Sequence, residues 1–497
     1  MSRVIVIGAG MGGMACAARL QAQGHKVTVI EQSSTWGGKL GRVTHDGHTF
    51  DTGPSLLTLP AVYRDLFLKT GKPLEDSVDV VDLETAFRYQ FSDGTVLRMP
   101  GVGVGKSAEA IGDALGGSAA TQWREFMDRA SSMWAATRTP FLESELQGLR
   151  TLLALSTRMR DLRTIAPLKT LRSLSEHYFT DPRLVTLVDR YATYTGSDPR
   201  RAPAALATIP YIEQTFGAYH VAGGLRELGR ALFDRCVELG VDFQFDTDVI
   251  GINGTTRATG VTIADGRVMN SEIVVANADA STIYDRLLTE PAKRKCRSEM
   301  RKISKSTPSL SGFVLLLALN GTTGDLEHHN VFFPQNYDEE FNSIFGKQPK
   351  PIEDPTIYVC RPDDLAMAPH NAESWFVLIN APRHQPASGF NWDTPGVVDA
   401  YGEHILKRLN GLGYNVESRK IWQHFSSPAD LQSRTRAPGG SIYGTSSNGT
   451  SSAFLRPTNA SPLPGLFLVG GSSHPGGGLP LVAMSAAIVA KRIGQGR

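Results

Sequence analysis

The sequence has few cysteines, and they lie far from one another. The chain of 497 residues has four of them and no CxxC pair: Cys16, Cys236, Cys296 and Cys360. This spacing argues against a zinc site and against a disulfide framework. We therefore expect no bound metal and a reducing, cytoplasmic environment.

The chain also has no excess of charge of either sign. Its 51 lysines and arginines nearly balance its 49 aspartates and glutamates, which leaves a net charge of +2. So small a charge creates no general field that would gather a polyanion, and nucleic acid is not an expected partner. The length favours at least two domains, since a single domain usually has about 100–200 residues.

A third absence is that of an uninterrupted apolar run. Residues 457–490 contain no Asp, Glu, Lys or Arg, but glycines and prolines between Gly470 and Pro480 divide them into two pieces. Each piece is too short for a helix that crosses ~30 Å of hydrocarbon, so we predict no transmembrane segment. The apolar N-terminus is not read as a signal peptide, because its glycines follow the spacing described next.

What the chain does contain is a dinucleotide-binding pattern over residues 4–31. Residues 4–7 form an apolar run typical of a buried parallel strand, and Gly8, Gly10 and Gly13 follow at GxGxxG spacing. The first glycine permits the turn, the second lets the backbone approach a pyrophosphate, and the third lets the helix pack on its strand. A second strand ends at Glu31, where an acid accepts hydrogen bonds from the adenosine ribose. A glycine-rich turn without a nucleotide would explain the glycines but not this acid.

The pattern of the remaining chain indicates an insertion into the nucleotide-binding domain. Helical periodicity dominates residues 108–203, whereas residues 310–319 and 374–381 are apolar runs that suggest an antiparallel sheet. Between them, residues 223–276 return to the helices and strands of the nucleotide-binding domain. We predict a nucleotide-binding domain built from residues 1–100, 216–290 and 426–497, a helical region over residues 101–215, and a substrate-domain sheet over residues 291–425.

One helical segment is basic as well as amphipathic. Residues 150–172 contain one acidic residue, Asp161, and several leucines. They also contain six basic residues: Arg150, Arg158, Arg160, Arg163, Lys169 and Arg172. Helices of this kind bind membrane surfaces, but a solvated face on a core helix has the same composition. Both interpretations stay open.

Four motifs together resemble those of a known family. They are the glycine motif that ends at Glu31, GGK at residues 37–39, DTGPS at residues 51–55 and GGSSHPGGGLP at residues 470–480. As a set they resemble the bacterial carotenoid desaturases, which are the phytoene-desaturase family of flavoproteins and are related to the amine oxidases. The likeness extends over residues 4–493, and the C-terminal motif is most similar to the hydroxycarotenoid 3,4-desaturase branch.

The resemblance implies an α/β fold, in which a Rossmann-like FAD-binding domain carries an inserted domain of helices and antiparallel sheet, as in the amine oxidases. It implies FAD as the cofactor and distributes residues along it: Glu31 at the adenosine ribose, Val249 at the adenine, Gly38 and Lys39 at the diphosphate, Gly470 and Gly471 at the ribityl diphosphate, Gly53, Pro54 and Ser55 at the flavin end, and Pro480, Leu481 and Val482 at the flavin ring. Lys39 and Ser55 stand where relatives often carry arginine and threonine. Both changes keep the charge or the hydroxyl.

Two features near the expected cofactor concern charge. A helix that starts near Pro480 would direct free N–H groups and its positive dipole end at the negative charge of a reduced flavin ring. Lys39 or Arg42 could neutralise a diphosphate. His474 precedes that helix, but the sequence supplies no partner carboxylate, so we assign no catalytic residue.

The family likeness implies that the chain removes two hydrogens from a saturated carbon–carbon bond beside a polyene, with a hydride passing to flavin N5. No second GxGxxG unit follows a strand-like run, so we expect oxygen or a quinone as electron acceptor instead of a nicotinamide. An apolar isoprenoid substrate predicts peripheral association with the inner face of the membrane. The alternatives are a saturase or oxygenase (ketolase) of the same family, a flavin amine oxidase, or a non-catalytic flavin or lipid-binding protein. The oligomeric state stays open.

Overall fold

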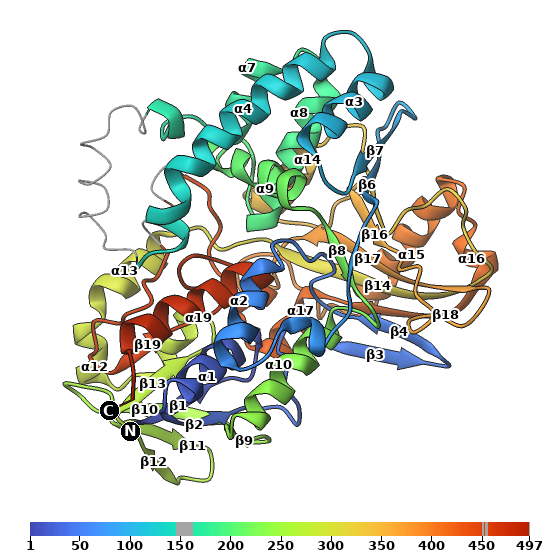
Figure 1. Cartoon of the computed structure of the whole chain (residues 1–497). Coiled ribbons are helices and arrows are strands. Elements are labelled where there is room, and N and C mark those ends of the chain that lie inside the picture. The colour runs from blue at the N-terminus through green and yellow to red at the C-terminus, as the bar shows by residue number, and fades with distance from the viewer. Residues whose placement is uncertain (146–162, 450–451, 453–455, 497) are drawn as a thin grey trace.

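Five parallel strands form a sheet at which both ends of the chain meet (Figure 1). The computed structural model describes residues 1–145, 163–449, 452 and 456–496. The strand order is β19 (Leu466–Leu468), β13 (Ile273–Ala276), β1 (Arg3–Ile7), β2 (Lys26–Ile30) and β9 (Asp242–Gln244). The strand predicted at residues 4–7 is therefore confirmed as β1, and it lies in one sheet with β19, with β13 between them.

Successive side chains of β1 point to opposite faces of this sheet, and each face has its own core. Val4 and Val6 pack on one face against α1 (Met11–Ala22), which also contacts the helices α2 (Ala61–Thr70), α10 (Arg226–Glu238) and α19 (Leu479–Ile493). Ile5 and Ile7 pack on the other face against a three-stranded sheet of β10 (Val249–Asn253), β11 (Gly260–Ile263) and β12 (Val268–Asn270). The short helices α11 (Ala280–Thr282), α12 (Glu290–Lys295) and α13 (Arg297–Lys305) follow β13 on that side.

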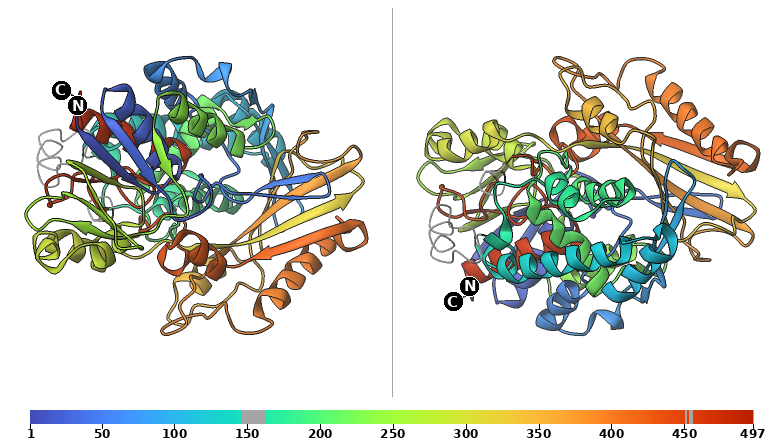
Figure 2. Two further views of the ribbon diagram at one scale, coloured as in Figure 1. Left: turned by 90° about the horizontal axis from the view of Figure 1, so that it is seen from below. Right: turned by 90° about the horizontal axis from the view of Figure 1, so that it is seen from above.

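A second, seven-stranded sheet lies beside this body (Figure 2). The apolar runs at residues 310–319 and 374–381 form its longest strands, β14 and β17, which pair antiparallel as predicted. The strand order is β18 (Lys420–Ser426), β14 (Ser311–Asn320), β17 (Ala372–Ala381), β16 (Ile357–Cys360), β15 (His329–Phe332), β6 (Thr85–Gln90) and β7 (Val96–Pro100). Strands β6 and β7 belong to residues 1–100, so this stretch supplies strands to both sheets instead of to the nucleotide-binding domain alone.

Each face of the large sheet is covered by a different element. Phe313, Leu315 and Leu317 of β14 pack with α15 (Val397–Gly411), whereas Leu316 packs with Phe50 of the hairpin β3 (Arg42–His45) and β4 (His48–Asp51). Strand β5 (Val80–Asp82) pairs with β8 (Tyr219–Val221) where the two bodies meet. The other helices near the sheet are α14 (Asp338–Phe345), α16 (Val416–Arg419) and α17 (Pro428–Thr435).

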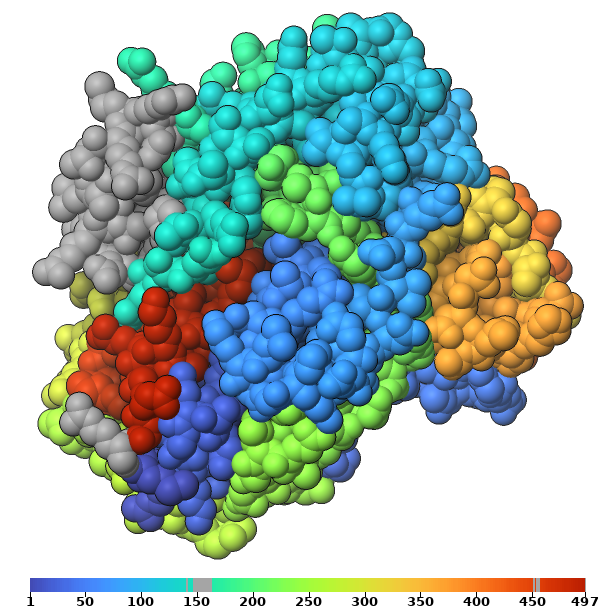
Figure 3. Space-filling view, in the orientation of Figure 1, coloured from blue at the N-terminus to red at the C-terminus, as the bar shows by residue number. Residues whose placement is uncertain are grey.

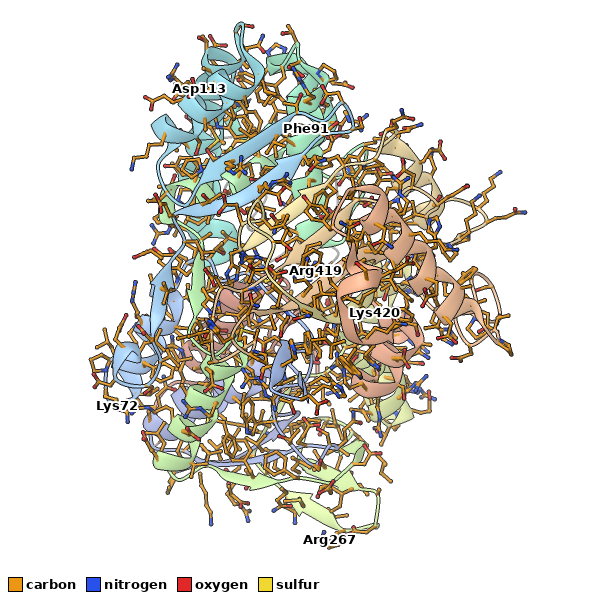
Figure 4. All side chains as sticks on the ribbon, turned by 90° about the vertical axis from the view of Figure 1, so that its right-hand side faces the viewer. Lys72, Phe91, Asp113, Arg267, Arg419 and Lys420 are labelled. Atoms are coloured by element: carbon orange, nitrogen blue, oxygen red, sulfur yellow. The ribbon has the colours of Figure 1, made fainter. Side chains whose placement is uncertain are left out.

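The predicted helical region forms a layer over both sheets, drawn in cyan and green in Figures 1 and 3. Trp123 and Phe126 anchor it through a core shared with β6 and β7. Figure 4 labels Asp113 on this layer and Arg267 in the turn between β11 and β12, at opposite ends of the molecule. The helices are α3 (Val104–Leu115), α4 (Ala119–Thr137), α7 (Leu171–Tyr178), α8 (Pro182–Arg190) and α9 (Thr208–Phe216).

Within the described residues, no helix combines the length and the apolar character that crossing a bilayer requires.

Candidate active site

Three parallel strands end at one point, and glycines let them do so. Gly8, Asn277 and Gly470 follow the strands β1, β13 and β19 along the chain. A Cβ atom on Gly8 would lie 2.8 Å from the Asn277 carbonyl oxygen, and a Cβ atom on Gly470 would lie 2.5 Å from Asn277 Oδ1. A Cβ on Gly13 would lie 2.1 Å from the Gly8 carbonyl oxygen. No side chain larger than hydrogen fits these positions without displacing its neighbours, and ligands of parallel sheets bind at this edge.

The N-terminus of α1 provides free N–H groups at this edge. Gly10 is the N-cap residue, no side chain caps the helix, and its first turn has no acid. The following loop folds back onto it: Gly37 N donates to the Ala9 carbonyl (2.9 Å), and a Cβ on Gly38 would lie 3.3 Å from Gly10 Cα. An uncapped helix N-terminus of this kind binds a diphosphate.

Glu31 is buried at the end of β2, beside the glycine turn. Its carboxylate accepts hydrogen bonds from Ala9 N (2.7 Å) and from the N–H (3.0 Å) and hydroxyl (2.7 Å) of Ser33. A carboxylate offers about four acceptor positions, so one stays free for a ribose hydroxyl. Thr247 N donates to the Glu31 carbonyl (2.9 Å), which holds the segment leading to Val249 next to this acid.

The two cations considered for the diphosphate are engaged with protein groups. Lys39 Nζ donates to the carbonyls of Ser441 (2.9 Å) and Ile442 (2.5 Å), so it ties the N-terminal segment to the C-terminal one. Burial lowers the pKa of Lys39 to about 8. Arg42 donates to Glu227 (2.7 Å), so its charge is already paired. The contact of Lys39 with a diphosphate stays a prediction.

The DTGPS segment places Ser55 against the large sheet. A Cβ on Gly53 would lie 2.0 Å from the Lys39 carbonyl oxygen, so Pro54 and Ser55 follow a tight crossing of two backbone segments. Ser55 Oγ and Tyr358 OH are 2.8 Å apart, and Tyr358 OH lies 2.8 Å from His329 Nδ1. Burial raises the pKa of Tyr358 and lowers the pKa of His329, so this chain of hydrogen bonds joins neutral groups.

Ser55 also faces a small cavity between the hairpin and the large sheet. Its lining is mixed, with the apolar side chains Phe50 and Phe376 beside the polar side chains Asp51, His220 and His328. The chain of hydrogen bonds therefore begins beside an internal space.

The C-terminal glycine loop leads into α19, and open space lies beside the N-cap residue of this helix. Gly478, the N-cap residue of α19, has a φ of +105° and no atom within 4 Å of the position of a Cβ. Pro480 lies in the first turn, as predicted, and Val482 N donates to the Gly478 carbonyl (3.0 Å). Gly471 is held by its carbonyl, which accepts a hydrogen bond from Arg456 (2.8 Å).

His474 of this loop is held by the backbone. Its Nε2 lies 3.0 Å from the Ser144 carbonyl oxygen, to which it donates, and burial lowers its pKa to about 4. No carboxylate of the described residues hydrogen-bonds to it, so we still assign it no catalytic role.

The helical region reaches the same loop through Tyr443. A Cβ on Gly477 would lie 2.4 Å from the Tyr443 ring, and one on Gly196 would lie 3.0 Å from it. Burial raises the pKa of Tyr443 to about 12, and the charge of Arg190 acts in the opposite direction. The Tyr443 ring thus lies between the helical region and the C-terminal glycine loop.

The comparisons with known proteins agree with this geometry. The model of a family described as flavin containing amine oxidoreductase matches residues 11–383. This chain belongs to that family. It is also 33% identical to the 4,4'-diapolycopene oxygenase of a Methylomonas species, over 99% of this chain and 98% of that one.

Two further similarities extend over the whole length. The chain is 32% identical to the 1-hydroxycarotenoid 3,4-desaturase of a Flavobacterium species, over 99% of both chains. The solved structure of cyclohexylamine oxidase from Brevibacterium oxydans covers 99% of both chains with a TM-score of 0.60 at 14% identity, which shows a shared fold. The resemblance to carotenoid desaturases and the amine-oxidase-like architecture are therefore confirmed.

The cofactor is FAD, and the residues of this structure fit it. The glycines at the ends of β1 and β19 let the backbone approach a bound pyrophosphate closely. The N-terminus of α1 has no side-chain cap and can bind a diphosphate, and the Glu31 carboxylate keeps one acceptor position for a ribose hydroxyl. The roles of individual residues along FAD stay predictions.

The sequence carries little signal for five residues that the fold brings to this site. Asn277 could be found as the residue that ends a parallel strand. The others have no pattern of their own, because each belongs to an element that packs here from elsewhere: His329, Tyr358, Arg190 and Tyr443.

Proposed function

We propose that this chain is an FAD-dependent desaturase that introduces a carbon–carbon double bond into a carotenoid or a related polyisoprenoid. The observation that carries the proposal is the full-length similarity, above 30% identity, to an enzyme named as a 1-hydroxycarotenoid 3,4-desaturase. The apolar side chains of the inserted sheet support an apolar substrate.

When bound, FAD would supply at flavin N5 the acceptor for the hydride that leaves the substrate, and the second hydrogen would leave as a proton. The protein's own contribution is placement and electrostatics. The first-turn N–H groups of α19 stabilise negative charge at the open space before Gly478. Burial raises the pKa of Tyr358 and lowers the pKa of His329, so these two groups carry no charge for the reaction, which depends on the position of the substrate.

We also propose peripheral association with the inner face of the membrane, where such a substrate resides. Arg163 and Lys169 are exposed, and Leu168 between them is 86% exposed. Arg172 does not belong to this surface, because it forms ion pairs with Asp189 and Asp338. The other predicted cations of the basic segment lie outside the described residues: Arg150, Arg158 and Arg160.

A second candidate function is oxygenation of the same kind of substrate, since the Methylomonas relative is named as an oxygenase at similar identity. The electron acceptor that we propose for the desaturase is oxygen or a quinone. Mass spectrometry of the products from an acyclic carotene in liposomes separates the possibilities. Desaturation predicts the loss of two hydrogens, whereas a gain of oxygen would indicate an oxygenase. A shortened chromophore that requires added reductant would indicate a saturase, and turnover of amines alone would indicate an amine oxidase.

A further inference from the structure

Two histidines and a cysteine lie together at the paired strands β15 and β16. The pairing places His329 opposite Cys360, and His328 directly precedes His329 in the chain. One ligand atom of each residue, a ring nitrogen or Sγ, lies within 4.8 Å of the ligand atoms of the other two. The spacing of the cysteines in the sequence predicts no metal, but strand pairing assembles a set of donors that no short motif contains.

The types of donor match a borderline-soft divalent cation. Thiolate and imidazole ligands suit Zn²⁺, whereas Mg²⁺ and Ca²⁺ prefer carboxylate and carbonyl oxygens. The ligand atoms of a tetrahedral zinc site are roughly 3.3–3.6 Å apart, because Zn–N and Zn–S bonds are about 2.1 and 2.3 Å long. The three atoms here therefore have to approach one another by at most about 1.5 Å, which side-chain rotations can supply.

A space of the size of one ion or one water adjoins the three residues. His328 and Cys360 line the small cavity that Ser55 also faces, and the volume of this cavity is about 20 Å³. About 10–15 Å³ is enough to hold one water molecule. Three protein ligands would leave the fourth position of a tetrahedral ion to a water.

His329 has the hydrogen bonds that a metal ligand requires. Its Nδ1 lies 2.8 Å from Tyr358 OH, whereas its buried Nε2 has no hydrogen-bond partner within the described part of the chain. Buried polar atoms normally have a partner, so this nitrogen requires an explanation. When Nδ1–H donates to Tyr358, Nε2 keeps a free lone pair, and histidines that bind metals are commonly oriented through their other ring nitrogen in this way.

The charges around His328 can accommodate a bound cation. The His328 ring centroid lies 4.7 Å from that of His220, whose Nε2 lies 2.8 Å from Asp364 Oδ2. Arg361, whose positive charge acts on His328, is already paired with Glu373. The Asp364 carboxylate therefore attracts a cation at this place, whereas the repulsion from Arg361 is partly compensated.

We propose that His328, His329 and Cys360 bind one Zn²⁺, or a divalent cation of the same class, and that Tyr358 orients His329. Binding releases the thiol proton of Cys360 to solvent and involves no redox step. Because Tyr358 also lies 2.8 Å from Ser55 Oγ, the ion would hold β15 and β16 together next to the predicted flavin end. The inference does not rest on the proposed function, since metal binding is measured without a polyene.

The test titrates the FAD-loaded protein, freed of metal, with Co²⁺, which replaces Zn²⁺ in tetrahedral sites and then absorbs at longer wavelengths than oxidised flavin. We expect one tetrahedral cobalt ion per chain, displaced by one equivalent of Zn²⁺, and no such absorbance in Cys360→Ala. Tyr358→Phe should weaken cobalt binding about 10- to 100-fold, as for other residues that orient a metal ligand. The matched control is Cys296→Ala, which removes a buried thiol next to Ser461 and should bind cobalt unchanged.

An absent or octahedral cobalt spectrum in the unaltered protein would overturn the inference, as would a tetrahedral spectrum that survives in Cys360→Ala. If Cys360→Ala fails to fold, His328→Gln takes its place, and an unchanged spectrum there would have the same meaning. Equal loss of cobalt absorbance in Cys296→Ala would place the ion elsewhere and would also overturn the inference. Failure of every polyene to reduce the flavin would refute the proposed function but would leave the cobalt result unaffected.

Discussion

Replacing Gly13 by alanine adds one methyl group where α1 passes close to the turn that follows β1. The new Cβ would lie 2.1 Å from the Gly8 carbonyl oxygen, whereas real Cβ atoms essentially never approach closer than 3.0 Å. Helix α1 must therefore move away from β1 by about 0.9 Å. Overpacking of this kind costs ~1–3 kcal/mol, which the better helix propensity of alanine offsets by at most ~1 kcal/mol. The shift also moves the N–H groups that face the diphosphate.

The matched control is Gly105→Ala, in the first turn of α3, where a Cβ would have no atom within 4 Å. Flavin absorbance of the purified variants and the midpoint of thermal unfolding provide the two measurements. We expect Gly13→Ala to lose most of its FAD and to unfold at a lower temperature, and Gly105→Ala to keep both values or to unfold slightly later. Full flavin content and an unchanged midpoint in Gly13→Ala would refute the close approach of α1 to β1 as the basis of FAD binding.

Three more predictions follow from the site and the surface. Because Lys39 has a lowered pKa of about 8, a neighbouring diphosphate would raise that pKa, and FAD binding above pH 8 would take up a proton. FAD affinity should then fall up to tenfold per pH unit above pH 8 in the unaltered protein but not in Lys39→Gln; a flat profile in both would contradict contact with the diphosphate. Gly478→Val should slow flavin reduction, because it displaces the start of α19. The control is Gly494→Val at the other end of that helix, where φ is also positive and the space is equally open, and it should not slow flavin reduction. Equal rates of flavin reduction in the two variants would argue against a role for the helix start. Finally, sedimentation with anionic liposomes should weaken at high salt and in a variant with Arg158, Arg160 and Arg163 replaced by glutamine, since each basic residue near the surface contributes ~1 kcal/mol. Binding unchanged by either would identify the segment as a solvated face.

The parts of the fold that are local in sequence could be predicted. Residues 4–31 hold a strand, turn, helix and strand in one continuous pattern, and the apolar runs of β14 and β17 are long enough to identify as strands. The placement of β6 could not be predicted, because it pairs with β15 more than two hundred residues later and neither strand encodes that register. Arg172 shows the same limit: it looks like part of a basic face until Asp338, 166 residues away, is packed against it.

The candidate site divides in the same way. Gly8, Gly10, Gly13 and Glu31 could be found because spacing along one short stretch determines their geometry. Tyr358 and His329 come from β16 and β15, and only tertiary packing brings their side chains near Ser55. The residues that bind the cofactor can thus be predicted from the sequence. The residues on the substrate side of the site cannot, because they come together only when the inserted domain folds.

The most direct test of the proposed desaturation is an anaerobic mixture of the FAD-loaded protein with an acyclic carotene, or its hydroxy derivative, in liposomes. Flavin absorbance and polyene absorbance are followed together. The account predicts that the flavin bleaches while the polyene band moves to longer wavelength in the same phase, with one flavin reduced for each new double bond. A flavin that stays oxidised with every polyene, but bleaches with an amine, would contradict it.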